Sequence, residues 1–234
     1  MSLYLILLIS SVIIPFFLSF DRKVSFYRIW PFLLPALVIT AIPFILADIF
    51  FTGRGIWGFN PRYNSGIIIA SLPLEEWLFF ILIPYSSIFI HYVLKAYFPD
   101  LMLTDRITRI TTVILTAVLL IGVILNSERA YPALYFSVMI IVLLISISAG
   151  KKLLNRFYIS FLIIIIPFLI INGILTGSFI AEEVVWYNPD EITGIRVFTV
   201  PVEDFTYGFS LILLNLLLMN YFRRWSHKKS ESQK

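Results

Sequence analysis

NPRYNSGIIIASLPLEEW (residues 60–77) is the stretch around which the rest of the chain is organised. It joins a polar loop, punctuated by proline and glycine, to an apolar helix that carries two adjacent carboxylates in its first turn. The same design returns 128 positions later as NPDEITGIRVFTVPVEDF (residues 188–205). Upstream, the TG dipeptide at 52–53 returns at 176–177, an offset of 124. The sequence therefore contains two copies of one acid-bearing motif.

The composition is that of an integral membrane protein. Of the 234 residues, 59% are hydrophobic and 14% are charged, whereas soluble domains have about 25% charged residues. Mean hydropathy is +0.92. The chain has no cysteine, which excludes disulfides, thiolate nucleophiles and cysteine-ligated metals. Basic residues in such a protein mark the cytoplasmic side, so the net charge of +4 does not indicate nucleic acid as a partner.

Seven segments are long enough to cross a bilayer as helices, for which about 20 apolar residues are needed. They cover residues 2–20, 31–51, 73–97, 107–125, 133–149, 157–178 and 201–222. The first lacks a basic start and is interpreted as a retained helix, with a cleaved signal peptide as the alternative. Prolines at 35, 43, 84 and 167 lie inside spans, where neighbouring groups can satisfy the freed carbonyls.

The distribution of Lys and Arg predicts the orientation. Fourteen of these residues lie in the loops after spans one, three and five and in the C-terminal tail, and four lie on the opposite side. The positive-inside bias then places the N-terminus outside, the C-terminus in the cytoplasm and both acidic motifs on the non-cytoplasmic side. The expected location is a bacterial cytoplasmic membrane.

The repeat predicts the architecture: an all-α integral membrane protein of seven transmembrane helices, built from two parallel three-helix repeats and a connecting helix. The expected parts are a first repeat at 1–97, the connecting helix and its loops at 98–130, a second repeat at 131–222 and a basic cytoplasmic tail at 223–234. The tail is expected to be irregular and to anchor on anionic lipid. Spans three and seven should face each other and bring the acids together.

Five acids are candidate catalytic residues, and four of them are the paired carboxylates of the motifs. The paired acids are Glu75, Glu76, Glu203 and Asp204. Pro73 and Pro201 suit the first helical position, which places these acids in first turns. Acidic residues in a first helical turn are often simple caps that the helix dipole favours. Two adjacent acids at the same spacing in both copies favour a function instead. Neighbouring helix residues point about 100° apart, so one acid of each pair should face the cavity, and Glu75 and Glu203 are the expected inward ones.

Asp48 is the fifth candidate, because it lies inside the second span, where a lone charge is costly. Its counterpart in the second copy is Asn172, so the two halves differ chemically. An acid in a water-poor site can hold a proton near neutrality. The alternative is a protonated aspartate that only hydrogen-bonds to another helix.

Aromatic and amide side chains surround both motifs. The candidate substrate-binding residues are Trp57, Phe59, Asn60, Trp77, Phe79, Trp186, Tyr187, Asn188, Phe205 and Tyr207. Trp and Tyr commonly form belts at the membrane surface, but beside paired acids their ring faces could also stabilise a cation that water cannot reach. Asn60 and Asn188 precede proline and are typical of turns, and Arg62 and Arg196 are candidates for orienting a carboxylate.

No cofactor or metal is expected. The sequence has no glycine-rich dinucleotide or P-loop pattern, and His91 and His227 are isolated. These features leave two classes of function. One is redox-neutral acid–base chemistry on a lipophilic compound, and the other is translocation of protons or solutes.

The motifs resemble the membrane-integral lycopene cyclase family, the small-subunit type of bacteria that also occurs fused in archaea and in fungal phytoene synthase–cyclases. The resemblance is carried by DIFFT (48–52), GIWGFNP (55–61) and LPLEEWLFF (72–80). VWYNP (185–189) and PVEDF (201–205) resemble the partner subunit, so two halves that are separate chains in some bacteria look joined here. The resemblance covers almost the whole chain.

The resemblance implies conversion of lycopene, a linear carotenoid, to a product with β-ionone rings. A proton adds to the terminal double bond, the next double bond attacks the cation, and a ring proton is lost. The resemblance implies that the family's glutamates correspond to the four paired acids here and that its acid in the second span corresponds to Asp48. The nucleotide-binding fingerprint of the flavin-dependent cyclases, a different family, is absent, so no flavin is implied. The implied partners are the carotenoid substrate and membrane lipid, and the resemblance is also compatible with association with other carotenoid enzymes. The carotenoid is expected to enter sideways, from the bilayer. Hydration of a carotenoid end group and proton-coupled transport are the alternatives.

Overall fold

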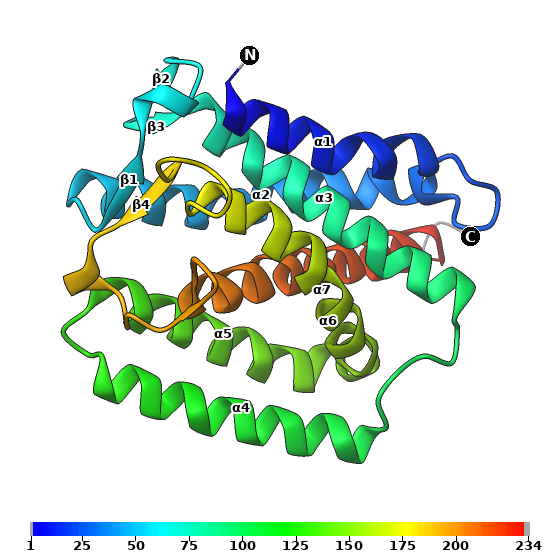
Figure 1. Ribbon diagram of the computed structural model, residues 1–234. Coiled ribbons are helices and arrows are strands. Elements are labelled where there is room, and N and C mark those ends of the chain that lie inside the picture. Colours follow the sequence, from blue (N-terminus) through cyan, green and yellow to red (C-terminus); the bar gives the residue numbers. More distant parts are fainter. Residues whose placement is uncertain (1, 232–234) are drawn as a thin grey trace.

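The computed structural model describes residues 2–231, and within that range the chain forms seven α-helices (Figure 1). The helices are α1 (Leu3–Leu18), α2 (Trp30–Gly53), α3 (Leu74–Tyr97), α4 (Asp105–Leu125), α5 (Ala130–Ala149), α6 (Lys151–Leu175) and α7 (Val202–Glu231). The short strands are β1 (Trp57–Phe59), β2 (Ile68–Ile69), β3 (Leu72–Pro73), β4 (Val185–Tyr187), β5 (Arg196–Val197) and β6 (Val200–Pro201). Single 3-10 turns occur at Phe26–Ile29, Pro61–Tyr63 and Pro189–Glu191.

The helices have the length and composition of membrane spans. Six of those described are long and apolar enough to cross a bilayer, and α1, with 16 residues, is a shorter apolar helix. Large apolar side chains cover their outer faces, such as Phe17 at 70% exposed and Leu125 at 76%. Such a surface suits hydrocarbon rather than water. The predicted class, an all-α integral membrane protein, is confirmed.

Equivalent helices of the two halves pack in equivalent ways. α1 lies along α3, and α5 lies along α7 (Figure 1). The halves meet where α2 packs against α7 and α3 packs against α6. α4 packs on α5 at the edge of the bundle (Figure 1) and connects the halves. The starts of α3 and α7 consequently lie on the same side of the molecule, together with both acidic motifs.

A two-stranded sheet, which the sequence did not indicate, joins the loops of the two halves. β1 pairs antiparallel with β4, with Gly58 opposite Trp186 at the centre of the register. A Cβ on Gly58 would lie 2.6 Å from a ring carbon of Trp186, so only glycine allows this approach. Two hairpins, β2–β3 and β5–β6, lead directly into α3 and α7. The loops therefore close over one end of the bundle.

Two local expectations were wrong. The irregular tail expected from residue 223 is helical as far as Glu231, because α7 continues through a segment rich in Lys and Arg, which are good helix formers. Residues 232–234 of that tail lie outside the described residues. Pro73 and Pro201 end the strands β3 and β6, one position before the helices, instead of occupying the first helical position. The acids that follow still fall in the first turn.

Candidate active site

One acid of each pair is turned toward a loop. Glu75 is 1% exposed, and its carboxylate accepts hydrogen bonds from the Ser65 backbone N–H (2.6 Å) and from the Ser2 hydroxyl (2.6 Å). Glu203 is fully buried and accepts from the Thr193 backbone N–H at 2.5 Å. Both acids thus tie the loop that precedes their own helix. The expectation that Glu75 and Glu203 face the cavity was wrong, because the hairpins bend these backbone donors back onto the helix start.

The other acid of each pair faces the interior. The Tyr4 hydroxyl donates to Oε2 of Glu76 at 2.5 Å, and the Tyr131 hydroxyl donates to Oδ1 of Asp204 at 2.7 Å. Asp204 also accepts from the Tyr187 hydroxyl, at 2.9 Å. Burial and the neighbouring Asp204 carboxylate raise the pKa of Tyr187, so its phenol keeps the proton that it donates. The two inward acids are therefore fixed by phenols from both halves of the chain.

Asp48 joins this group from α2. It has no exposed surface, and its two carboxylate oxygens accept from the hydroxyls of Tyr135 (3.3 Å) and Tyr207 (3.2 Å). Its predicted counterpart, Asn172, also lines the site. The structure thus brings three of the five predicted acids, from α2, α3 and α7, into one site.

The three acids line a small cavity of about 50 Å³, which we call the acid pocket. Of the ten predicted substrate-binding residues, four contribute to its wall: Trp57, Phe79, Tyr187 and Tyr207. Glu76 and Asp204 are 5% and 4% exposed. The loops and the surrounding rings therefore keep the acids apart from bulk water, which strengthens electrostatic interactions inside the pocket.

The remaining six predicted residues lie outside this wall. Phe59 packs on the rings of Tyr4 and Trp57, behind the acid pocket. The Trp77 indole donates to the Ile69 carbonyl, and Trp186 covers Gly58. Asn188 caps a 3-10 turn through the Asp190 N–H, as Asn60 does through the Arg62 N–H. Phe205 packs against Phe168. All six hold the loops or helices that frame the site.

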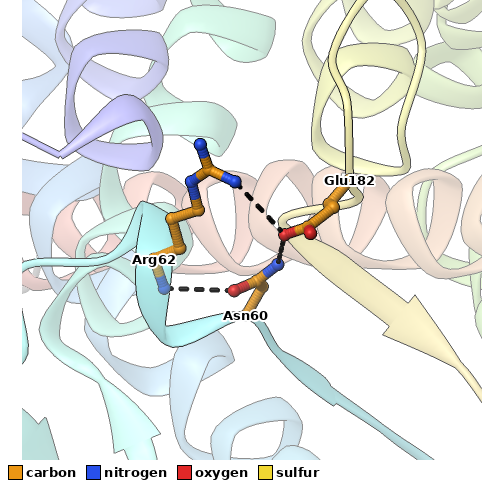
Figure 2. A network of polar contacts seen from close by, with 3 residues as sticks. All are labelled: Asn60, Arg62 and Glu182. Carbon is orange, nitrogen blue, oxygen red and sulfur yellow. Dashed lines mark hydrogen bonds and ion pairs between the residues drawn. The ribbon is translucent and has the colours of Figure 1, made fainter.

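A surface contact connects the loops of the two halves (Figure 2). The Asn60 side-chain amide donates to Glu182 Oε2 at 3.1 Å, and the Arg62 guanidinium lies 3.7 Å from the same oxygen. Arg196 donates to the Thr199 carbonyl and lies over the Tyr187 ring, 5.6 Å from its centroid. Of the two arginines expected to orient a carboxylate, Arg62 lies beside that of Glu182, outside the paired acids, whereas Arg196 contacts a carbonyl and a ring instead.

Sequence reasoning missed the tyrosines of α1 and α5. Tyr4, Tyr131 and Tyr135 each donate to one of the three acids of the pocket, although none of them lies near a motif. Tyr4 and Tyr131 are 127 positions apart, one fewer than the motif offset. A search that allowed a shift of one residue from the motif offset, and that included the residues just before the fifth span, would have identified this pair. Nothing in the sequence pairs either tyrosine with a particular carboxylate.

A second cavity, of about 380 Å³, adjoins the acid pocket. We call it the lateral groove; it runs between α1, α3, α6 and α7 and is lined mainly by apolar side chains. Among the described residues, no cluster of three or more His, Asp or Glu side chains is arranged to hold a metal ion. The site can therefore offer proton donors, proton acceptors and aromatic faces to a lipophilic molecule.

These features define a class: an integral membrane protein with a buried acid pocket beside an apolar groove. Residues 1–94 and 128–222 match the lycopene cyclase family, and the chain belongs to that family. Both matched regions contain one acidic motif, and the gap between them contains the whole of α4. Membership indicates an enzyme that acts on carotenoids in the membrane. Searches of curated proteins and of solved structures found no match.

Proposed function

We propose that the protein is a lycopene β-cyclase, an isomerase that closes the end of a linear carotenoid into a ring by adding one proton and removing another. The observation that carries this proposal is the group of three acids from three helices, each bonded to a tyrosine, within one pocket beside an apolar groove. A general acid and a general base in a site closed to water suffice for such a reaction. The substrate reaches them sideways, from the lipid.

Hydrogen-bond geometry suggests the proton donor and the base. Asp204 accepts two phenols at 2.7 and 2.9 Å, which stabilise a carboxylate. Asp48 has the longest bonds of the three acids, at 3.2 and 3.3 Å, and is fully buried. The acid with the weakest donors is best suited to carry a proton in an apolar site. We therefore assign the proton donor to Asp48 and the base to Asp204, with Glu76 as an additional negative charge in the pocket.

The proposed steps balance. The Asp48 carboxyl gives its proton to the terminal double bond, which leaves a tertiary cation on the neighbouring carbon. The next double bond attacks that carbon, a ring carbon–carbon bond forms, and the cation moves into the ring. Asp204 removes a proton from a carbon beside it, and a ring double bond forms. Return of this proton to Asp48 completes the cycle, so the product has the same composition as the substrate.

Aromatic rings surround the place where the cation would form. Phe79 and Tyr207 line both the acid pocket and the lateral groove, and Trp57 lines the acid pocket. Cation–π attraction is worth about 2 kcal/mol or more when the site is desolvated. The same rings exclude water, which would otherwise capture the cation and give a hydrated product instead of a ring.

Expression in a host that makes lycopene tests the proposal. We expect pigment chromatography to show cyclic carotenoids of unchanged mass. When purified protein converts unlabelled lycopene in D2O buffer, each new ring should contain one deuterium, because the added proton comes from an exchangeable carboxyl. A host that expresses Asp48→Asn is the control. Lycopene that remains unconverted would refute the cyclase, and a product that has gained water would identify the hydratase instead.

A further inference from the structure

The lateral groove presents an almost wholly apolar wall. Ser10, Ser11 and Ser86 line it, but each donates its hydroxyl to a carbonyl of its own helix, at 2.6 to 2.9 Å. Its volume of about 380 Å³ falls within the range of about 300–1,000 Å³ that is usual for small-molecule sites. These properties suit an apolar chain.

The groove connects the surface of the bundle with the acid pocket. Its inner end shares Phe79, Asn172 and Tyr207 with the acid pocket. Its outer end includes Ile14 of α1 and Ile170 of α6, which are 63% and 59% exposed on the apolar outer face of the bundle. A linear molecule in the groove would therefore have one end at the acids and the other toward the hydrocarbon.

The duplication predicts a second groove on the other side of the pocket, but aromatic rings occupy that place. Phe80 corresponds to Gly208 at the motif offset of 128, and it is fully buried. Phe80 packs 6.4 Å from Phe44 and 6.3 Å from Tyr207, measured between ring centroids, and Tyr135 lies 4.7 Å from Tyr207. The place equivalent to the groove, on the Asp48 side of the acid pocket, is therefore filled, while the groove itself lies on the Asn172 side and is open.

Gly208 is a position in the groove wall at which the two halves differ by a whole phenyl ring. It lines the lateral groove, and a Cβ placed on it would lie 3.4 Å from Cε2 of Phe168, another residue of the wall. A phenyl group like that of Phe80 would have to displace Phe168 or extend into the groove. The absence of a side chain at this position therefore keeps the groove open.

We propose that the protein has a single groove for the unreacted polyene, kept open by Gly208, so that the two ends of a linear carotenoid are cyclised in separate binding events. The inference rests on the proposed function and deepens it. Since rings fill the place that the repeat relates to the groove, the second end of the polyene cannot reach the acids from that side. The molecule has to leave and re-enter the groove in the opposite direction. A product with one ring is then released into the membrane.

Substitution of Gly208 tests the groove. Gly208→Phe is expected to lose about ten- to a hundredfold in kcat/KM for lycopene, because it overpacks the groove. Gly208→Ala should lose less activity while its melting temperature stays the same or rises, because alanine is the better helix former. Lower activity with unreduced stability is an outcome that a merely structural glycine would not give.

Gly53→Phe is the matched control, because Gly53 also belongs to a helix but is exposed, and a Cβ placed on it would have no atom within 4 Å. It should retain wild-type activity. If Gly208→Phe is folded and fully active, the polyene does not use the groove, and a lipid acyl chain is its occupant. If Gly208→Phe does not fold, the alanine variant decides: unchanged kcat/KM would overturn the inference.

A time course with purified wild-type protein in nanodiscs tests the separate events. Monocyclic product should appear before any bicyclic product or remain the only product, and added isotope-labelled monocyclic carotenoid should compete for any second cyclisation. Bicyclic product formed without free monocycle and without incorporation of the label would overturn the inference. Lycopene left unconverted by the wild type would instead refute the proposed function itself.

Discussion

The Tyr4 hydroxyl lies 2.5 Å from Oε2 of Glu76, and this contact joins the first helix of the chain to the start of the third. The second half repeats it between Tyr131 and Asp204, at 2.7 Å. In both pairs the second acid (Glu76 or Asp204) accepts a hydrogen bond from a phenol. The first acid (Glu75 or Glu203) accepts one from the loop that precedes its helix. This arrangement separates two roles that a pair of adjacent carboxylates can have, and most of the following predictions depend on it.

The inward acids should be required for cyclisation but not for folding. We expect Glu76→Gln, Asp204→Asn and Asp48→Asn each to lower cyclisation by about 10²- to 10⁴-fold, the usual contribution of a positioned acid or base. Carotenoid product per unit of folded protein is the measurement, with folding checked by size-exclusion chromatography in detergent. Near-normal activity of the Asp48 and Asp204 variants would refute the assignment of Asp48 as proton donor and Asp204 as base.

The loop-binding acids should matter for stability first. Glu75→Gln replaces the carboxylate that accepts hydrogen bonds from Ser65 and Ser2 by a neutral amide, and so weakens these bonds. Hydrogen bonds to charged groups are worth about 1.5–3 kcal/mol, so we expect a lower melting temperature, with substantial cyclisation in the protein that remains folded. Glu203→Gln should behave similarly through Thr193. A stable but inactive Glu75→Gln variant would instead assign this residue to the chemistry.

The phenols on Asp204 should adjust its activity without being indispensable. Tyr187→Phe and Tyr131→Phe each remove one donor and are expected to lower kcat/KM about tenfold or more. Because the pKa of Tyr187 is raised above its ordinary value, ionisation of this phenol should not limit activity between neutral and moderately alkaline pH. The wild type is therefore expected to show no fall in kcat/KM from ionisation of Tyr187 over that range in a pH–rate profile.

The contact between Asn60, Arg62 and Glu182 should contribute little energy. Arg62 and Glu182 have side chains that are 67% and 55% exposed, and exposed ion pairs are typically worth about 0–1 kcal/mol. Glu182→Gln should shift the melting temperature only slightly, whereas Gly58→Ala, which drives a Cβ into Trp186, should destabilise clearly. Thermal unfolding followed by tryptophan fluorescence compares the two. A larger loss in Glu182→Gln would mean that the exposed contact, not the sheet, holds the loops.

The proposed orientation can be measured directly because the chain has no cysteine. A single cysteine at Asp190 should react with a membrane-impermeant maleimide in intact cells, and one at Lys152 should react only after the cells are permeabilised. This pattern follows from the excess of Lys and Arg on the predicted cytoplasmic side. The reverse labelling pattern would invert the topology without affecting the proposed chemistry.

The sequence predicted the helices and the acids better than the directions of the side chains. Long apolar runs and the repeated motif are local signals, so the spans and the two halves could be identified. The choice between Glu75 and Glu76 could not, because it depends on where the hairpin brings the Ser65 N–H. The β1–β4 pairing was missed for a similar reason: it joins residues far apart in sequence through main-chain bonds. The tyrosines on α1 and α5 were missed because they are far from the motifs in sequence, so their contacts with the acids arise only in the folded structure.

The difference between Phe80 and Gly208, which occupy equivalent positions in the two halves, makes the two sides of the acid pocket unequal. Phe80 and the neighbouring rings fill the Asp48 side, whereas the Asn172 side opens into the lateral groove. Duplication without this divergence would give two competing entrances to one acid pocket. With one entrance, every substrate molecule approaches the acids from the same direction.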